Sequence, residues 1–272
     1  MDTFQKLSEA TAFLKQYAAK KSTIAVVLGS GLGNFSKELQ VDTEIKYDTI
    51  PHFPVATVEG HPGKLIFGSI GDKPIIAMAG RFHFYEGYSA EEVVFPIRVL
   101  KMLGIEILLI SNAAGGVAPG LRVGDLMIIT DHISVAVKNP LIGQNDDRLG
   151  PRFPDMSEPY KKDLISKAKE IAKLNSIEVK EGVYFGVTGP TFETRAEYRM
   201  IHLLGGDAVG MSTVQEVITA VHAGIKVFAM SVITDIGIRE DNNIITHHEV
   251  LEAAQKSEPL FSIIFRELIE SL

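Results

Sequence analysis

The stretch VTGPTFETRAEYRMIHLLGGDAVGMSTVQE, residues 187–216, predicts two short strands that each run into the start of a helix. The apolar run 182–187 is typical of a buried strand. Thr194 and Glu197 then have the spacing of a capping box, in which each side chain satisfies a backbone N–H group of the other residue. The paired glycines at 205–206 predict the end of that first helix.

The second half of the stretch repeats this arrangement. Residues 208–211 indicate a short strand, and a helix start follows at 213–216. In open α/β sheets, ligands bind beyond the carboxyl ends of the strands. Glu193 and Ser212 each follow one of these strands, so both are candidate site residues.

Apolar runs and amphipathic segments alternate along the rest of the chain, which predicts an α/β fold in a single domain over residues 1–272. The pattern contains no internal repeat. Capping signals and helical spacing predict helices at 3–20, 89–103, 158–175, 213–223 and 246–272. Short apolar runs predict further strands at 24–28, 74–79, 105–110, 126–130 and 226–233.

The composition favours a small-molecule partner. The chain has 272 residues and a net charge of −7, and apolar residues make up 46% of it. A negative balance argues against binding to nucleic acid or to an anionic membrane. The absence of cysteine excludes disulfides, a thiolate zinc site and a cysteine nucleophile. The N-terminus lacks a signal-peptide pattern and no window is long enough to span a membrane, so we expect a cytoplasmic protein.

A glycine-rich turn, Gly29-Ser30-Gly31-Leu32-Gly33, follows the first predicted strand. It does not match a dinucleotide fingerprint, because Asn34 stands where the last glycine is needed, and no Gly-Lys-Ser/Thr follows as in a P-loop. Two interpretations remain open. Such a turn can hold a single phosphate on its backbone N–H groups, with the hydroxyl of Ser30 at its tip, or it can be a plain tight turn.

A second glycine-bounded segment, residues 80–87, reads GRFHFYEG. Arg81, His83 and Tyr85 alternate there, and alternation in an extended segment places side chains on one face. Arginine supplies a fork of donors for phosphate, and histidine and tyrosine supply neutral donors. The alternative is an edge strand with a polar outer face. The position at a strand end favours an anion site.

Two more segments are candidates for ligand contact. The strand 105–110 ends in small residues that include Asn112 and Ala113, which would let a ligand approach the backbone closely. Residues 138–160 form a long segment rich in glycine and proline, and loops of this length within a compact domain are usually functional.

These motifs together resemble the trimeric purine nucleoside phosphorylases. That family has a G-P-x-F-E-T run, which reads GPTFET at 189–194, and a G-x-D-x-V-G-M-S-T run, which reads GGDAVGMST at 205–213 with a second glycine. Its R-x-H-x-Y-E-G motif matches residues 81–87. The resemblance covers the chain from about Gly29 onward. It implies a nucleoside phosphorylase-like fold, with a central mixed, mostly buried β-sheet flanked by helices.

The resemblance also implies an activity. Phosphate attacks C1′ of a purine nucleoside such as inosine or guanosine, and the free base and a (deoxy)ribose 1-phosphate are released. Phosphate is then a co-substrate, and neither a cofactor nor a metal is expected. The partners implied are these small molecules and two further copies of the chain in a homotrimer.

The residue types fit this chemistry, since hydroxyl, cationic and backbone donors suit an anion and carboxylates suit a base edge that carries N–H groups. The implied phosphate site is Ser30, His61, Arg81, His83, Ala113 and Ser212. The implied base site is Phe192, Glu193, Val209 and Asp235. The implied ribose site is Tyr85, Met211 and His247, with His248 as an alternative to His247. The implied catalytic residues are Glu193, Asp235 and His83, and Phe153 is expected to reach into a neighbouring subunit's site.

Two residues depart from the family pattern. Gln215 stands where proline is usual, in the first turn of a helix, and should change only rigidity. Asp235 stands where members specific for 6-oxopurines have asparagine, so the base preference stays open.

Three other functions are alternatives. One is a methylthioadenosine or adenosine phosphorylase of the same fold, but those enzymes have R-H-G-R in place of residues 81–84 and lack the Phe192-Glu193 pair. A nucleotide-binding oxidoreductase is disfavoured by the glycine spacing. A non-catalytic purine-binding module is disfavoured by the cluster of anion-binding groups.

Overall fold

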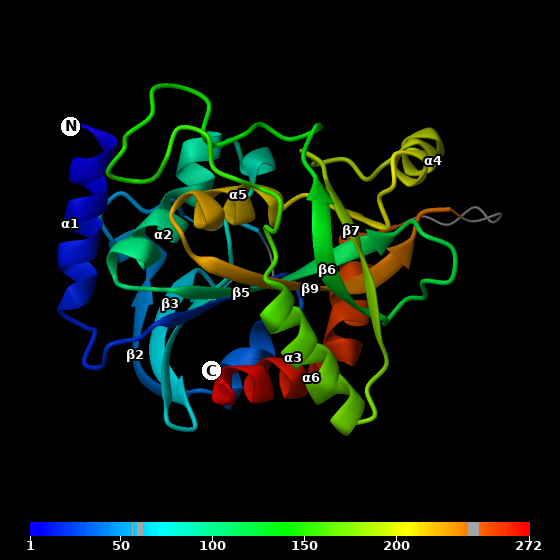
Figure 1. Ribbon diagram of the computed structural model, residues 1–272, viewed down its shortest axis with the longest axis horizontal. Helices are drawn as coiled ribbons and strands as arrows, with labels where there is room; N and C mark the ends of the chain where they lie inside the picture. The colour runs from blue at the N-terminus through cyan, green and yellow to red at the C-terminus, as the bar shows by residue number, and fades with distance from the viewer. Residues whose placement is uncertain (56, 59–61, 239–244) are drawn as a thin grey trace.

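The computed structural model describes residues 1–272 with the exception of 56, 59–61 and 239–244 (Figure 1). One mixed sheet of nine strands runs through the described part of the chain, in the order β2-β3-β4-β1-β5-β8-β7-β6-β9. The last strand, β9, also pairs with β5 in parallel, so the second half of the sheet curls back on itself. The strands are β1 (Ile24–Leu28), β2 (Gln40–Lys46), β3 (Lys64–Ile70), β4 (Lys73–Ala79), β5 (Ile107–Gly116), β6 (Leu126–Ile133), β7 (Val179–Gly186), β8 (Ala208–Gly210) and β9 (Lys226–Ile236).

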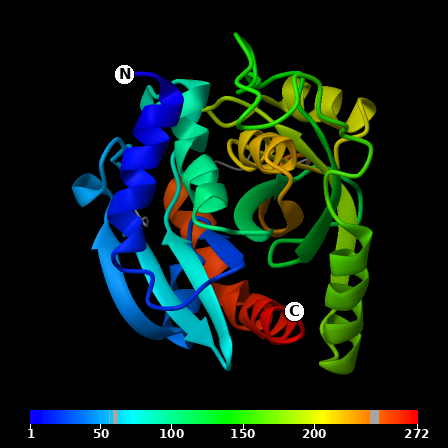
Figure 2. The ribbon, with the colours of Figure 1, turned by 60° about the vertical axis from the view of Figure 1, so that its left-hand side comes forward.

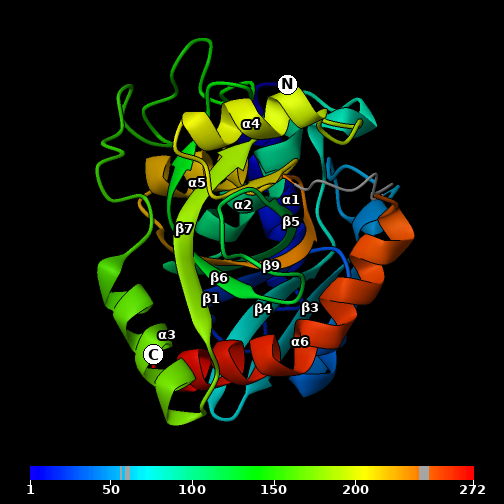
Figure 3. The same ribbon diagram turned by 90° about the vertical axis from the view of Figure 1, so that its right-hand side faces the viewer.

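Helices cover both faces of this sheet. In Figures 1 and 3, α1, α2 and α5 lie on one side of it, and α3 and α6 lie on the other. Figure 2 shows α1 beside α2. The helices are α1 (Thr3–Lys15), α2 (Ala90–Met102), α3 (Lys162–Leu174), α4 (Arg195–Leu203), α5 (Val214–His222) and α6 (His247–Glu270), and short 3₁₀ turns are η1 (Gly33–Glu38), η2 (Tyr47–Thr49) and η3 (Phe84–Glu86).

The central strands are buried on both faces, which explains their continuous apolar sequence. Every residue of β1 is buried, and β9 is buried from Val227 to Asp235. β1 and β9 flank part of β5 in the same direction, and β4 runs parallel to β1. The carboxyl ends of β1, β4, β5 and β9 therefore meet at one edge of the sheet.

The predicted fold class is confirmed, and so are the helix starts predicted from a capping-box spacing at Ser89, Thr194 and Thr246. The side chains of Ser89, Thr194 and Thr246 each accept a hydrogen bond from the backbone N–H of the glutamate three residues later, as the capping-box spacing predicted. These contacts satisfy N–H groups that have no partner within the helix.

Four predicted boundaries or conformations were wrong, the first of which is the helix predicted over 158–175, because α3 begins only at Lys162. α1 ends at Lys15 instead of near residue 20, because residues 16–20 are largely exposed and a short helix depends on packing of its apolar face. β5 continues through the small residues 111–116, since β8 and β9 pair with that segment. The alternating segment of residues 81–85 is extended only at its start, because η3 begins at Phe84.

The helices within the described ranges include none that is both long and apolar enough to cross a membrane.

Candidate functional site

A pocket of about 310 Å³ lies where the carboxyl ends of the strands meet. It brings together almost all of the residues predicted to form the site, although they come from separate strands, loops and helix starts. The predicted residues that line it are Ser30, Arg81, His83, Tyr85, Asn112, Ala113, Phe192, Glu193, Val209, Met211, Ser212, Asp235 and His247. The predicted phosphate ligand His61 lies outside the described residues.

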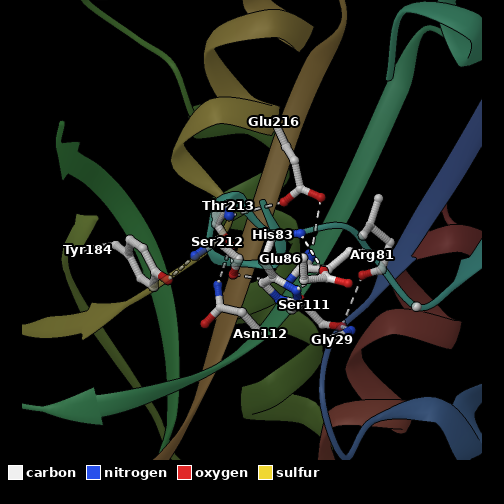
Figure 4. A network of polar contacts seen from close by, with 12 residues as sticks. Gly29, Arg81, His83, Glu86, Ser111, Asn112, Tyr184, Ser212, Thr213 and Glu216 are labelled. Atoms are coloured by element: carbon white, nitrogen blue, oxygen red, sulfur yellow. Dashed lines mark hydrogen bonds and ion pairs between the residues drawn. The ribbon is translucent and has the colours of Figure 1, made fainter. Parts of the chain in front are cut away.

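Arg81 provides the positive charge at one end of the pocket. It follows β4 directly and its side chain is only 1% exposed. Its Nη1 donates to the carbonyl oxygen of Ser111 at 2.7 Å and to Oγ of Ser212 at 3.3 Å. Its Nε donates to Oε1 of Glu216 at 3.3 Å (Figure 4). These contacts fix the orientation of the guanidinium group. Its paired N–H donors can bind two oxygens of a phosphate at once.

The turn that carries Ser212 is held in an unusual conformation. Thr213 has a φ of 68°, a left-handed value that a β-branched residue rarely adopts. Its Oγ1 accepts a hydrogen bond from Nδ2 of Asn112 at 2.9 Å and lies 3.2 Å from Oγ of Ser212. Because Thr213 caps α5, the turn places Ser212 at the positive end of that helix, which favours an anion there.

His83 and Tyr85 form the adjacent wall. Their rings stack with centroids 4.7 Å apart and an angle of 16° between the planes. Nδ1 of His83 lies 3.0 Å from Oε1 of Glu86. Burial acts to raise the pKa of Glu86, but hydrogen bonds from His83 and Thr57 outweigh burial and lower this pKa to about 2. Glu86 is thus ionised and can only accept, so Nδ1 of His83 is the donor in this contact. Burial also raises the pKa of Tyr85 to about 12, so its hydroxyl stays neutral.

The glycine turn after β1 packs tightly against its surroundings. A Cβ at Gly29 would lie 2.6 Å from the carbonyl oxygen of Ser111, so only glycine fits there. The side chain of Asn34 donates to Oε2 of Glu258 at 2.8 Å, and the N–H of Phe35 donates to Oε1 at 3.0 Å. Asn34 therefore ties the turn to α6, which explains why this position is not the glycine of a dinucleotide-binding loop.

Two carboxylates lie at the other end of the pocket. Burial raises the pKa of Glu193, and the negative charge of Asp235 raises it further. Oδ1 of Asp235 accepts a hydrogen bond from Oγ1 of Thr234 at 3.1 Å. A Cβ at Gly115 would lie 2.9 Å from Oδ2 of Asp235, so the glycine makes room for this carboxylate. This end can accept hydrogen bonds from a heterocycle that carries N–H groups.

The structure distinguishes the two candidate histidines at the start of α6. His247 lines the pocket. The side chain of His248 is 80% exposed and lies 3.9 Å from Glu252. Of the two, only His247 is near enough to contact a ligand in the pocket.

Phe153 does not reach this pocket in its own chain. Its side chain is 87% exposed, and it lines a separate surface hollow beside Arg152 and Leu141. The guanidinium carbon of Arg152 lies 5.6 Å from the centre of the phenyl ring, and Arg152 donates to the carbonyl oxygen of Leu141 at 3.0 Å. The loop thus presents an apolar ring to the solvent.

The sequence did not single out several residues that build the site. Thr234, Gly115 and Val58 line the pocket, and Glu86 and Glu216 hold its walls. The signal for Glu86 was its place in the run of residues 80–87, and Glu216 stands three residues after Thr213, at the spacing of a capping box.

In the described ranges, no group of three or more histidine, aspartate or glutamate side chains is arranged to hold a metal ion.

Comparison with known proteins identifies relatives of the whole chain. Residues 23–270 match the family model of the Phosphorylase superfamily. The chain is 49% identical to purine nucleoside phosphorylase 1 of Bacillus subtilis, over 97% of both sequences. It is 43% identical to purine nucleoside phosphorylase of Rattus norvegicus, over 98% of the chain and 96% of the relative.

Solved structures agree with these relatives. Isoform 2 of purine nucleoside phosphorylase from Schistosoma mansoni, in complex with cytosine and ribose-1-phosphate, matches with a TM-score of 0.93 and 43% identity. The match covers 99% of this chain and 97% of that one. A purine nucleoside phosphorylase of Schistosoma mansoni in complex with adenosine matches with a TM-score of 0.92 and 39% identity, over 98% and 97% of the two chains.

Proposed function

This chain belongs to the phosphorylase superfamily, and from that premise we propose how its pocket cleaves purine nucleosides. The enzyme is a pentosyltransferase. It catalyses the phosphate-dependent cleavage of the N-glycosidic bond of purine (deoxy)ribonucleosides to a free base and (deoxy)ribose 1-phosphate, the activity that its relatives' names state.

One observation carries the assignment of roles within the pocket. Arg81 contacts Ser111, and Asp235 lies against Gly115, four residues further along β5, so the cationic and hydroxyl donors and the two carboxylates line different ends of the cavity. The first end suits an anion and the second suits a purine edge. The distribution of charge therefore supports a phosphate at one end and a base at the other, with the sugar between them.

We assign phosphate binding to the donor end, at Ser30, Arg81, His83, Ala113 and Ser212. His61 stays a prediction. Cleavage of a glycosidic bond passes through a transition state with positive charge on the sugar. A phosphate held below C1′ stabilises that charge, and donors fixed in advance hold the phosphate without rearrangement during the reaction.

We assign base binding to Phe192, Glu193, Val209 and Asp235. Glu193 accepts from N1–H of a 6-oxopurine. Asp235 hydrogen-bonds N7, and it must carry a proton to stabilise the negative charge that develops there as the base leaves. Tyr85, Met211 and His247 contact the ribose. In this scheme Glu193, Asp235 and His83 are the catalytic residues.

Asp235 supports a second candidate specificity. An ionised aspartate only accepts hydrogen bonds, so it suits a 6-amino group better than a 6-oxo group. An adenosine-preferring phosphorylase of the same fold is therefore the alternative.

We further propose that residues 1–272 act as one cytoplasmic domain that needs no cofactor and binds neither nucleic acid nor membranes, with phosphate as co-substrate. We also propose a homotrimer. The support for an oligomer is Phe153, an exposed ring on an outward-facing loop that the resemblance assigns to a neighbour's site.

The test measures base release from inosine, guanosine, xanthosine, adenosine and methylthioadenosine, each with and without phosphate. We expect hypoxanthine and ribose 1-phosphate from inosine only when phosphate is present. Release without phosphate would indicate a hydrolase, and binding of purine without turnover would indicate a binding module. A strong preference for methylthioadenosine would replace the proposed substrate.

A further inference from the structure

We propose that Glu216 is a positioning residue, which holds the phosphate end of the pocket in its binding geometry without touching substrate. The inference rests on the proposed function, because it concerns the end of the site assigned to the phosphate co-substrate.

Glu216 lies behind the pocket and joins two of its parts. It is 4% exposed and is not among the described residues that line the cavity. Its Oε1 accepts from Nε of Arg81 at 3.3 Å, and its Oε2 accepts from the backbone N–H of Thr213 at 3.1 Å. One carboxylate thus links the cation of the site to the turn that carries Ser212 (Figure 4).

The first link sets the orientation of the guanidinium plane. A guanidinium group is planar and its N–H groups point in fixed directions. Glu216 holds Nε of Arg81, while Ser111 and Ser212 hold Nη1. Loss of the Nε contact would let the plane turn about its Nη1 contacts, and the fork would no longer match the oxygens of a phosphate.

The second link stabilises a strained backbone. The left-handed conformation of Thr213, with φ 68°, costs about 1–3 kcal/mol and persists only where its surroundings enforce it. The contacts that hold it include the N–H bond to Glu216 and the bond from Asn112 to Oγ1. Without the first contact, the turn can relax and move Ser212 away from Arg81.

The negative charge of Glu216 opposes phosphate binding, whereas its two hydrogen bonds favour it. A carboxylate beside Arg81 reduces the attraction that the arginine exerts on an anion. If Glu216 served only to balance a buried charge, its neutralisation would make phosphate bind more tightly. If it positions Arg81 and Thr213, its neutralisation weakens phosphate binding. The sign of the change in affinity separates these two roles.

The experiment compares Glu216→Gln and Glu216→Asp with the wild-type enzyme. Glutamine keeps the size of the side chain but offers one acceptor oxygen for two donors. Aspartate keeps the charge but is one methylene shorter, so it cannot reach both donors. The matched control is Glu92→Gln, which alters the capping box of α2, where Glu92 accepts from the N–H of Ser89 at 2.7 Å. Measurements are the phosphate Kd by calorimetry, the KM values for phosphate and inosine, and the Tm.

We expect both Glu216 variants to raise the phosphate Kd and KM by about tenfold, equivalent to about 1.4 kcal/mol, while the KM for inosine changes by less than about twofold. Glu92→Gln should leave phosphate affinity unchanged.

Unchanged or tighter phosphate binding in Glu216→Gln would overturn the proposal, as would a parallel rise in both KM values. If the glutamine variant does not fold, the aspartate variant decides by the same criteria. If neither folds, the role is structural and the proposal is rejected. A wild-type enzyme that neither binds phosphate nor uses it would instead refute the proposed function.

Discussion

Oε1 of Glu86 contacts both the backbone N–H and ring Nδ1 of His83, at 2.8 and 3.0 Å. A single carboxylate oxygen therefore fixes the position and the tautomer of the imidazole. Oε2 of the same residue accepts from the backbone N–H of Thr57 at 3.0 Å. The carboxylate is saturated with donors, which keeps it ionised and keeps Nδ1 of His83 protonated.

Glu86→Gln should lower kcat/KM by about tenfold to a hundredfold, by analogy with the loss of the hydrogen-bond partner that orients a metal-binding histidine. The amide can donate as well as accept, so it no longer enforces one tautomer. Steady-state kinetics with inosine and phosphate check this, with Glu92→Gln as the control. Full activity in the glutamine variant would show that the orientation of His83 does not depend on the charge of Glu86.

The same substitution predicts a pH dependence of stability. The pKa of Glu86 is lowered in the folded state from 4.5 to about 2, so ionised Glu86 stabilises the fold above pH 4.5, and this contribution is lost as the pH falls from 4.5 to about 2. The difference in Tm between the wild-type enzyme and Glu86→Gln should therefore be constant above that window and shrink within it. Thermal unfolding at a series of pH values measures this. A constant difference at all pH values would contradict the lowered pKa.

Arg81→Lys should reduce kcat/KM for phosphate by about two to three powers of ten, as for other donors removed from a transition-state site. Lysine keeps the positive charge that balances Glu216, so the buried ion pair is not left with a single partner. A compact ammonium group cannot reproduce the planar fork. The loss should appear in the phosphate dependence of the rate. Unchanged phosphate kinetics would show that Arg81 does not hold the co-substrate.

The sequence predicted those parts of the site that depend on neighbours along the chain. Arg81, Glu193 and Ser212 were found because each follows a strand and lies beside glycine or a capping signal. The contact between Arg81 and Glu216 could not be found in this way, because 135 positions separate the two residues. Only strand pairing and the packing of α5 bring them together.

The strand boundaries likewise depend on contacts between residues that lie far apart in the sequence. The small residues at 111–116 suggest a loop by composition, and they form a strand because β9 pairs with them from the other end of the chain. Asn34, directly after the glycine turn 29–33, is another example. The sequence could not show what Asn34 does, because its contact with Glu258 joins this segment to the last helix.

Phe153→Ala should lower kcat/KM for nucleosides while the oligomer stays intact, since the ring is 87% exposed and contributes little to the fold of its own subunit. Light scattering should show a trimer for both proteins. A mixing experiment locates the ring. We expect Phe153→Ala and Arg81→Lys each to be impaired alone. Mixed assemblies should regain activity, because an intact pocket can then receive an intact ring from its neighbour. A fully active monomer, or no regain on mixing, would refute the shared site.

Asp235→Asn should raise the preference for inosine over adenosine. An asparagine can accept from purine N7–H and donate to a 6-oxo oxygen at the same time, whereas an ionised aspartate can only accept. Burial, with the charge of Asp235, raises the pKa of Glu193, so the two carboxylates share one pocket and disfavour joint ionisation. Asp235 donates to a 6-oxo oxygen only when it carries a proton, so the wild-type enzyme should use inosine and guanosine but discriminate less sharply against adenosine than the asparagine variant does.

The measurement is the ratio of kcat/KM for inosine and adenosine in the wild type and in Asp235→Asn. Each tenfold change in this ratio corresponds to about 1.4 kcal/mol of differential transition-state binding. Thr234→Val is the matched control, since it removes the hydroxyl that donates to Asp235 and leaves the carboxylate in place. It should shift the ratio less than the asparagine variant. If Asp235→Asn leaves the ratio unchanged, Asp235 does not read the 6-position, and the base lies in a different orientation from the one assigned here.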